Sequence, residues 1–210
     1  MIRRVVMAIL LVGLLLFIVA VGIPYYDRSV LADQAIEEAV LACNQEDWPR
    51  AEGRYTTAIR KLPADSAEAS RVYMARGAVR EQMKRYDDAV ADYSRCLEIE
   101  PNSDSYWAQR GITYYKAGRY RLADADLERC LAFNDCHTSA CMYAGMSAER
   151  QGDLDRAMVY YTRATTMPPV GAAPFAGLAR VYAAKGDFTN AHENAARARA
   201  INPEVRLEIE

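Results

Sequence analysis

Small residues recur along the chain at a nearly constant distance. Five alanines are separated by 38, 34, 34 and 34 residues: Ala51, Ala89, Ala123, Ala157 and Ala191. A large apolar or aromatic residue stands three positions before each of them, at Trp48, Tyr86, Tyr120, Leu154 and Phe188. Alanine or cysteine follows seven positions after each. Steps of three and seven keep residues on one face of a helix, so the pattern predicts a helix that opens at each large residue.

Turn signals precede and follow these helices. Gly152-Asp153 and Gly186-Asp187 each provide a helix-ending glycine followed by an N-cap aspartate, and Asp47 has the same capping role before Trp48. Twelve residues after four of the alanines a proline ends the helix, at Pro63, Pro101, Pro169 and Pro203. Each period therefore predicts two antiparallel helices joined by a short turn.

This pattern resembles the tetratricopeptide repeat family, whose unit is a helix-turn-helix pair of 34 residues. The resemblance implies an all-α superhelix of about five repeats within residues 27–210, at about 32–65, 70–103, 104–137, 138–171 and 172–205. Ala39 and Ala179 depart from the family by replacing its common glycine, and Asp135 replaces a proline. Residues 66–69 are an insertion that predicts an early start of the second repeat's first helix.

The N-terminal segment has a different pattern. Residues 5–23 contain no charged side chain, and Arg3 and Arg4 precede them. Nineteen helical residues nearly span the hydrocarbon core of a bilayer, so residues 1–26 are predicted to be a membrane anchor with a transmembrane helix at about 5–23. The flanking arginines predict a cytoplasmic N-terminus and an extracytoplasmic repeat domain, in a bacterium at the periplasmic face of the inner membrane. A cleaved signal peptide is the alternative.

In the tetratricopeptide repeat family, the first helices line a concave groove that binds peptides or helices. The resemblance implies that the groove contains Ile36, Val40, Arg71, Met74, Ile112, Tyr115, Met142, Met146 and Arg180. Methionines adapt to varied apolar partners, so the expected ligand is a protein or peptide with an apolar or amphipathic segment. The alternative is that these side chains only pack the first helices together. No asparagine follows the small residue of any first helix, so capture of a terminal carboxylate is not expected.

Composition narrows the function. Lysine and arginine number 26 against 28 acidic residues, which argues against a nucleic-acid binder that depends on overall positive charge. The chain has two histidines and lacks the usual nucleophile, redox and phosphate-binding motifs. We therefore expect neither an enzyme nor a cofactor.

Cysteines gather near the loop between the third and fourth repeats. Cys130, Cys136 and Cys141 are accompanied by His137, but their spacing matches none of the usual zinc patterns, so no metal site is expected. In an exported domain, Cys136 could form a disulfide with Cys141 or Cys130. The default role of Cys130, which occupies a repeat position for small residues, is packing.

Together these features predict a membrane-anchored scaffold or adaptor in a bacterial envelope assembly. Three alternatives remain open. One is a cytosol-facing targeting receptor, and another is an assistant in a redox or haem-maturation complex. The third is a homo-oligomer that self-associates through its last repeat, after which only residues 206–210 follow.

Overall fold

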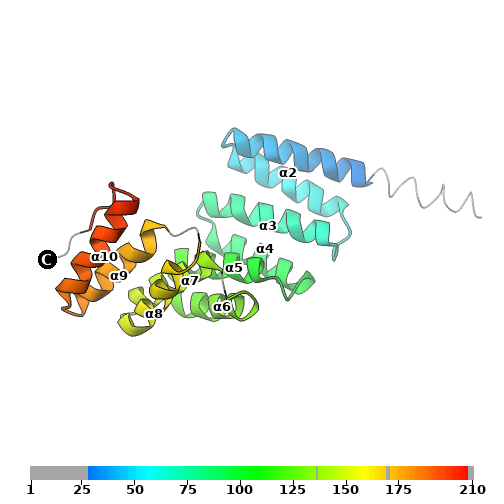
Figure 1. The fold of residues 1–210 in the computed structure, drawn as a ribbon. Coiled ribbons are helices and arrows are strands. Elements are labelled where there is room, and N and C mark those ends of the chain that lie inside the picture. The colour runs from blue at the N-terminus through cyan, green and yellow to red at the C-terminus, as the bar shows by residue number, and fades with distance from the viewer. Residues whose placement is uncertain (1–27, 136, 169–170, 208–210) are drawn as a thin grey trace, which may run out of the picture. The chain divides into compact units, whose positions relative to one another are not determined.

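The structure is a computed structural model that describes residues 28–135, 137–168 and 171–207 (Figure 1). These residues form ten α-helices and no strand. The predicted transmembrane segment at 5–23 lies outside the described residues. Within the described part, none of the helices combines the length and the apolar character needed to cross a bilayer.

The described helices belong to two compact units, residues 28–83 and residues 84–207. The first unit contains a helix over 28–44, α2 (Trp48–Lys61) and α3 (Ala67–Gln82). The second unit contains α4 (Tyr86–Ile99), α5 (Asp104–Lys116), α6 (Tyr120–Phe133), α7 (Thr138–Arg150), α8 (Leu154–Thr165), α9 (Ala172–Ala184) and α10 (Phe188–Ile201). The division falls inside the second predicted repeat.

The predicted helix starts are confirmed. The second helix of every repeat begins at the large residue that marks it in the sequence. The five recurring alanines have no exposed surface, and Cys96 and Cys130 are equally buried seven residues after two of them. Ser66 caps α3 by accepting a hydrogen bond from the Ala69 amide at 3.0 Å, so the insertion does lengthen the first helix of the second repeat.

The turns between paired helices repeat one backbone conformation. Gly118, Gly152 and Gly186 have φ angles of 75°, 78° and 80°, while Glu46 and Lys84 adopt similar angles at the same register in the first two repeats. Asp47, Asp153 and Asp187 then accept a hydrogen bond from the backbone of the following helix, as predicted. Arg85 and Arg119 take this position before α4 and α6 and provide no side-chain cap.

In the second unit the helix pairs stack as an α-solenoid, from α4 to α10 (Figure 1). Each helix packs on the next, and the first helices α5, α7 and α9 also contact one another. An ion pair supports this stack: Arg110 donates to both carboxylate oxygens of Asp126 at 2.7 and 2.9 Å and to the Ser94 hydroxyl at 3.0 Å. Three consecutive helices, α4 to α6, are joined through this one guanidinium.

Tyr161 joins the next three helices. Its side chain on α8 is fully buried and lies against Gly145 of α7 and Gly177 of α9. A Cβ atom at Gly145 would lie 2.7 Å from the tyrosine Cε1, and one at Gly177 would lie 2.6 Å from its Cζ. Both distances are too short for real carbon contacts, so only glycine lets the ring occupy this space.

Candidate functional site

The candidate site is the face of the second unit formed by the first helices of its repeats. We call it the first-helix surface and define it by Tyr115 on α5, by Arg180 on α9, and by four residues of α7: Met142, Tyr143, Met146 and Glu149. All six side chains are partly or fully accessible to solvent. The contacts among α5, α7 and α9 bring together residues that are up to 65 positions apart in sequence.

Aromatic rings occupy the α5 side of this surface. The rings of Tyr115 and Tyr143 meet edge to face, with centroids 5.4 Å apart and an interplanar angle of 68°. Tyr120, at the start of α6, adds a third ring 5.6 Å from that of Tyr115. Burial raises the pKa of the Tyr115 phenol, so its hydroxyl stays protonated at neutral pH and can donate a hydrogen bond. Packed tyrosines offer a partner a rigid amphipathic contact area.

Met142 and Met146 provide the centre of the surface. Both side chains are half-buried and pack against a core that includes Ala157, Tyr161 and Val181. The exposed part of each thioether side chain remains available to an apolar ligand, while the buried part joins α7 to its neighbours. The groove and packing interpretations of these methionines are therefore compatible.

An ion pair bounds the surface on the α9 side. Arg180 donates to both carboxylate oxygens of Glu149, at 2.7 and 2.8 Å, and the buried Tyr161 hydroxyl donates to the same carboxylate at 2.6 Å. Burial acts to raise the pKa of Glu149, but the hydrogen bonds from Arg180 and Tyr161 hold it below its ordinary value. The carboxylate is thus ionised and fixed, and most of the positive charge of Arg180 is compensated inside the protein.

The other predicted groove residues have different surroundings. Ile112 is only 6% exposed and belongs to the core of the second unit, because its position on α5 is covered by neighbouring helices. Its side chain therefore offers little surface to a partner. The remaining four lie on the first unit, where Val40, Arg71 and Met74 are exposed and Ile36 is half-buried.

The structure adds two features to the predicted site, the Tyr143 side chain and the contact between Glu149 and Arg180. Tyr143 occupies a repeat position where the adjacent repeats have Gln109 and Gly177, so periodicity does not mark it. Glu149 and Arg180 are 31 residues apart, close to one repeat length. A search for opposite charges at about that spacing could have found them, since it connects neighbouring first helices.

The cysteine cluster contains no complete metal site among the residues described. No group of three or more histidine, cysteine, aspartate or glutamate side chains is placed to hold an ion there. Cys130 is a free, fully buried thiol whose pKa burial raises to about 12. His137 caps α7 by accepting a hydrogen bond from the Ala140 amide at 3.2 Å. Cys136 lies outside the described residues, so its disulfide stays a prediction.

Comparisons with known proteins agree with the stacked helix pairs. Two family models, both described as tetratricopeptide repeat, match residues 70–103 and 109–176. A curated relative, the Hsp70-Hsp90 organizing protein of Triticum aestivum, is 28% identical over 99 residues. That alignment covers 47% of this chain and only 16% of the length of the relative.

Solved structures show the same fold. A MamA fragment, 41-end, from Desulfovibrio magneticus RS-1 has a TM-score of 0.74 and 16% identity, covering 84% of this chain and 97% of that one. YrrB, described as a tetratricopeptide repeat protein with an unusual peptide-binding site, has a TM-score of 0.64 and 24% identity. Its match covers 81% of this chain and 86% of the YrrB chain. These likenesses support the architecture derived above.

Proposed function

Because this chain contains tetratricopeptide repeats, we propose that it is a non-enzymatic scaffold whose first-helix surface binds an apolar or amphipathic segment of a protein partner. The observation that carries the proposal is the adjacency of packed tyrosines and half-buried methionines on α5 and α7. Such a surface can bury an apolar face of a partner helix while the tyrosine hydroxyls contact its polar atoms. The peptide-binding site named for YrrB supports a peptide ligand.

The ion pair at the α9 side favours an apolar ligand over a carboxylate tail at that point. Arg180 already contacts both oxygens of Glu149, so a ligand carboxylate would have to displace an internal partner that Tyr161 also holds in place. Replacing one fixed carboxylate by another yields little net free energy. Binding through Met142, Met146 and the tyrosines does not carry this cost.

The test uses two labelled peptides of about 18 residues with the same composition, one arranged as an amphipathic helix and one scrambled to remove its apolar face. We expect the patterned peptide to bind more tightly, and Met146→Glu to weaken that binding by about tenfold or more, because a charge would be buried against the apolar face. Fluorescence anisotropy measures both affinities.

Val159→Glu is the matched control, since it introduces the same charge on α8 at a side chain that is already 62% exposed. Its binding should equal that of the wild type. The proposal fails if the scrambled peptide binds as well as the patterned one, or if both variants weaken binding equally while circular dichroism shows an intact fold.

The proposed location is a membrane, with the repeats outside the cytoplasm and a role in bacterial envelope assembly. Its support is in the sequence, in the uncharged stretch at 5–23 and the two preceding arginines. Self-association through the last repeat is less favoured. Leu97 and Leu131 are buried at one repeat position, whereas α10 has the exposed Arg199 there, and a charged side chain disfavours an apolar contact with a second copy.

A further inference from the structure

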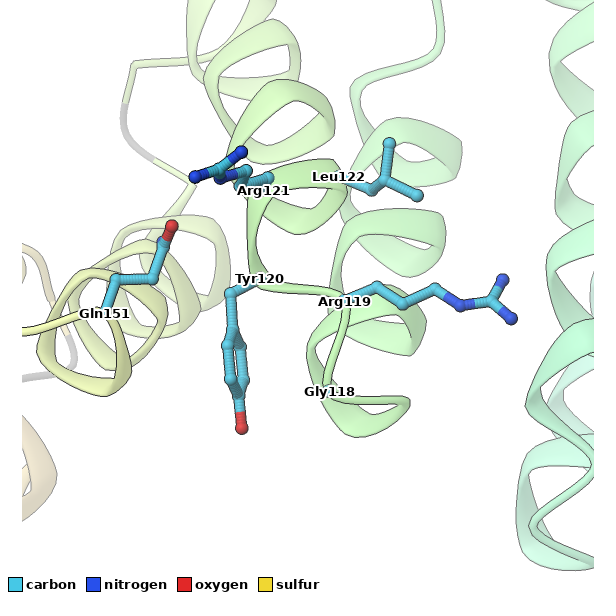
Figure 2. Close-up of a pocket in the computed structure, with 6 residues that line it drawn as sticks. All are labelled: Gly118, Arg119, Tyr120, Arg121, Leu122 and Gln151. Carbon is cyan, nitrogen blue, oxygen red and sulfur yellow. The ribbon is translucent and has the colours of Figure 1, made fainter.

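A shallow hollow of about 460 Å³ lies where α6 begins and α7 ends, and Tyr120 places it next to the first-helix surface. It is lined by five consecutive residues and by the C-cap residue of α7: Gly118, Arg119, Tyr120, Arg121, Leu122 and Gln151 (Figure 2). In Figure 2 the side chains of Arg121 and Gln151 extend on one side of the turn, while the Tyr120 ring extends on the other. Two of the lining residues are arginines and none is acidic.

A third arginine adjoins the hollow. The guanidinium of Arg150, the last residue of α7, stacks on the Tyr120 ring at 5.3 Å from its centroid. Stacking fixes the direction of the group without neutralising its charge, so it stays free to pair with an acid. Arg121 and Arg150 thus both bring positive charge close to Tyr120.

Neither of these two guanidinium groups forms a close ion pair of the kind found elsewhere in the unit, although Arg150 lies near enough to Glu149 to help lower the pKa of that carboxyl group. Arg110 is paired with Asp126, Arg156 with Asp124, and Arg180 with Glu149. Among the described residues, neither Arg121 nor Arg150 has an acidic partner within ion-pair distance. This local excess of positive charge stands out in a chain whose formal net charge is −2.

The other lining arginine, Arg119, is held only weakly. Arg119 meets Asp87 at 2.7 Å, but 47% and 76% of the two side chains are exposed, so water and salt compete with the pair. Arg119 also occupies the register at which Asp47, Asp153 and Asp187 stand in other repeats. The third repeat therefore has a positive charge at the edge of this hollow, where those other repeats have a negative one.

We propose that this hollow docks an acidic segment of a protein partner. Carboxylates of the segment pair with Arg121 and Arg150, because guanidinium groups bind carboxylates through two parallel hydrogen bonds. A neighbouring apolar side chain of the segment lies against Leu122, which is 49% exposed. The repeat domain then has two recognition surfaces of different chemistry, an apolar one on its first helices and a basic one at this turn.

The probe is a labelled peptide with a leucine flanked by glutamates, compared with a peptide in which every glutamate is glutamine. We expect the glutamate peptide to bind at least about tenfold more tightly than the glutamine peptide. Its binding should weaken as the salt concentration rises from about 50 to about 300 mM, because salt screens exposed ion pairs. The variant Arg121→Glu/Arg150→Gln should bind the glutamate peptide at least about tenfold more weakly than the wild type does.

Arg60→Glu/Arg206→Gln is the matched control, since it makes the same charge change at two exposed arginines that do not line the hollow. Its affinity should stay within about twofold of the wild type. The fold should survive in the test variant because an acid in the first turn of α6 interacts favourably with the helix dipole. Circular dichroism checks this.

Met142→Glu distinguishes this site from the proposed function, because residue 142 lies two helical turns from Arg150 on α7. It should weaken binding of the amphipathic peptide and leave binding of the glutamate peptide unaffected. Three results would each overturn the docking proposal. They are equal binding of the glutamine peptide, unchanged binding by Arg121→Glu/Arg150→Gln, and tighter binding of a single-stranded oligonucleotide than of the glutamate peptide. None of these results bears on the first-helix surface.

Discussion

Gly145 and Gly177 differ from the exposed Gly53 in the space that a Cβ atom would have at each position. One buried ring, that of Tyr161, lies against both of them, whereas nothing approaches within 4 Å of a Cβ built at Gly53. All three are helical, so each weakens its helix intrinsically compared with alanine. At Gly145 and Gly177 that cost is offset by the close packing of α7, α8 and α9.

Gly145→Ala should therefore lower the free energy of unfolding by about 1–3 kcal/mol, because the new methyl group would lie 2.7 Å from a fully buried ring. Gly53→Ala should leave stability unchanged or raise it by about 0.5–1 kcal/mol. Urea denaturation followed by circular dichroism measures both. Equal stability of the two variants would show that Tyr161 can repack.

At the scale of the helices, sequence periodicity predicted most of the fold. The second helices start at the predicted large residues because those residues recur with the buried alanines, and each repeat depends on its own local signals. The extent of exposure within a face was harder to predict. Ile112 and Met146 share one repeat position, yet Ile112 is in the core and Met146 is half-exposed, so the repeat position alone does not determine how much of a side chain is covered.

The contact between Glu149 and Arg180 was beyond prediction for a related reason. It joins α7 to α9 and depends on the buried Tyr161 hydroxyl of α8, so three helices must be placed before the pair can be recognised. The positive hollow beside Tyr120 likewise depends on which arginines find acidic partners after folding. Such pairings follow from packing and are not visible in the repeat pattern.

The pair gives the stability of the second unit a defined pH dependence. The native pKa of Glu149 lies below its ordinary value of 4.5, so the unfolded chain binds this proton more strongly than the native protein does. The ionised pair therefore stabilises the fold above about pH 4.5, and this contribution is lost as the pH falls through the native pKa. Glu149→Gln should cost about 1–3 kcal/mol at neutral pH and progressively less in acid.

Urea denaturation at a series of pH values measures that difference. Glu193→Gln is the control, because Glu193 pairs with Arg197 on the exposed face of α10 and should contribute about 0.5 kcal/mol or less. A Glu149→Gln cost that did not shrink with decreasing pH would mean that packing, rather than charge, explains the loss.

At the scale of the whole molecule, the compartment of the repeat domain decides which partners it can meet. Alkaline phosphatase fused after Glu210 should be active in a bacterial host, because the arginines before residues 5–23 are expected to stay in the cytoplasm. Moving two arginines to follow residue 23 and removing Arg3 and Arg4 should reduce that activity. Activity of a cytoplasmic reporter at the same fusion point would instead support the cytosol-facing receptor.

Tyr161 also limits how the repeats of this chain can be exchanged. Repeat proteins are often engineered by duplicating or transplanting single units, on the assumption that each unit brings its own contacts. The fourth repeat does not satisfy that assumption, because its tyrosine lies directly against a glycine in the first helix of the repeat that follows. A chimera that places residues 138–171 before any other repeat of this chain would set Tyr161 against a side chain, so the fourth and fifth repeats should be transferred together.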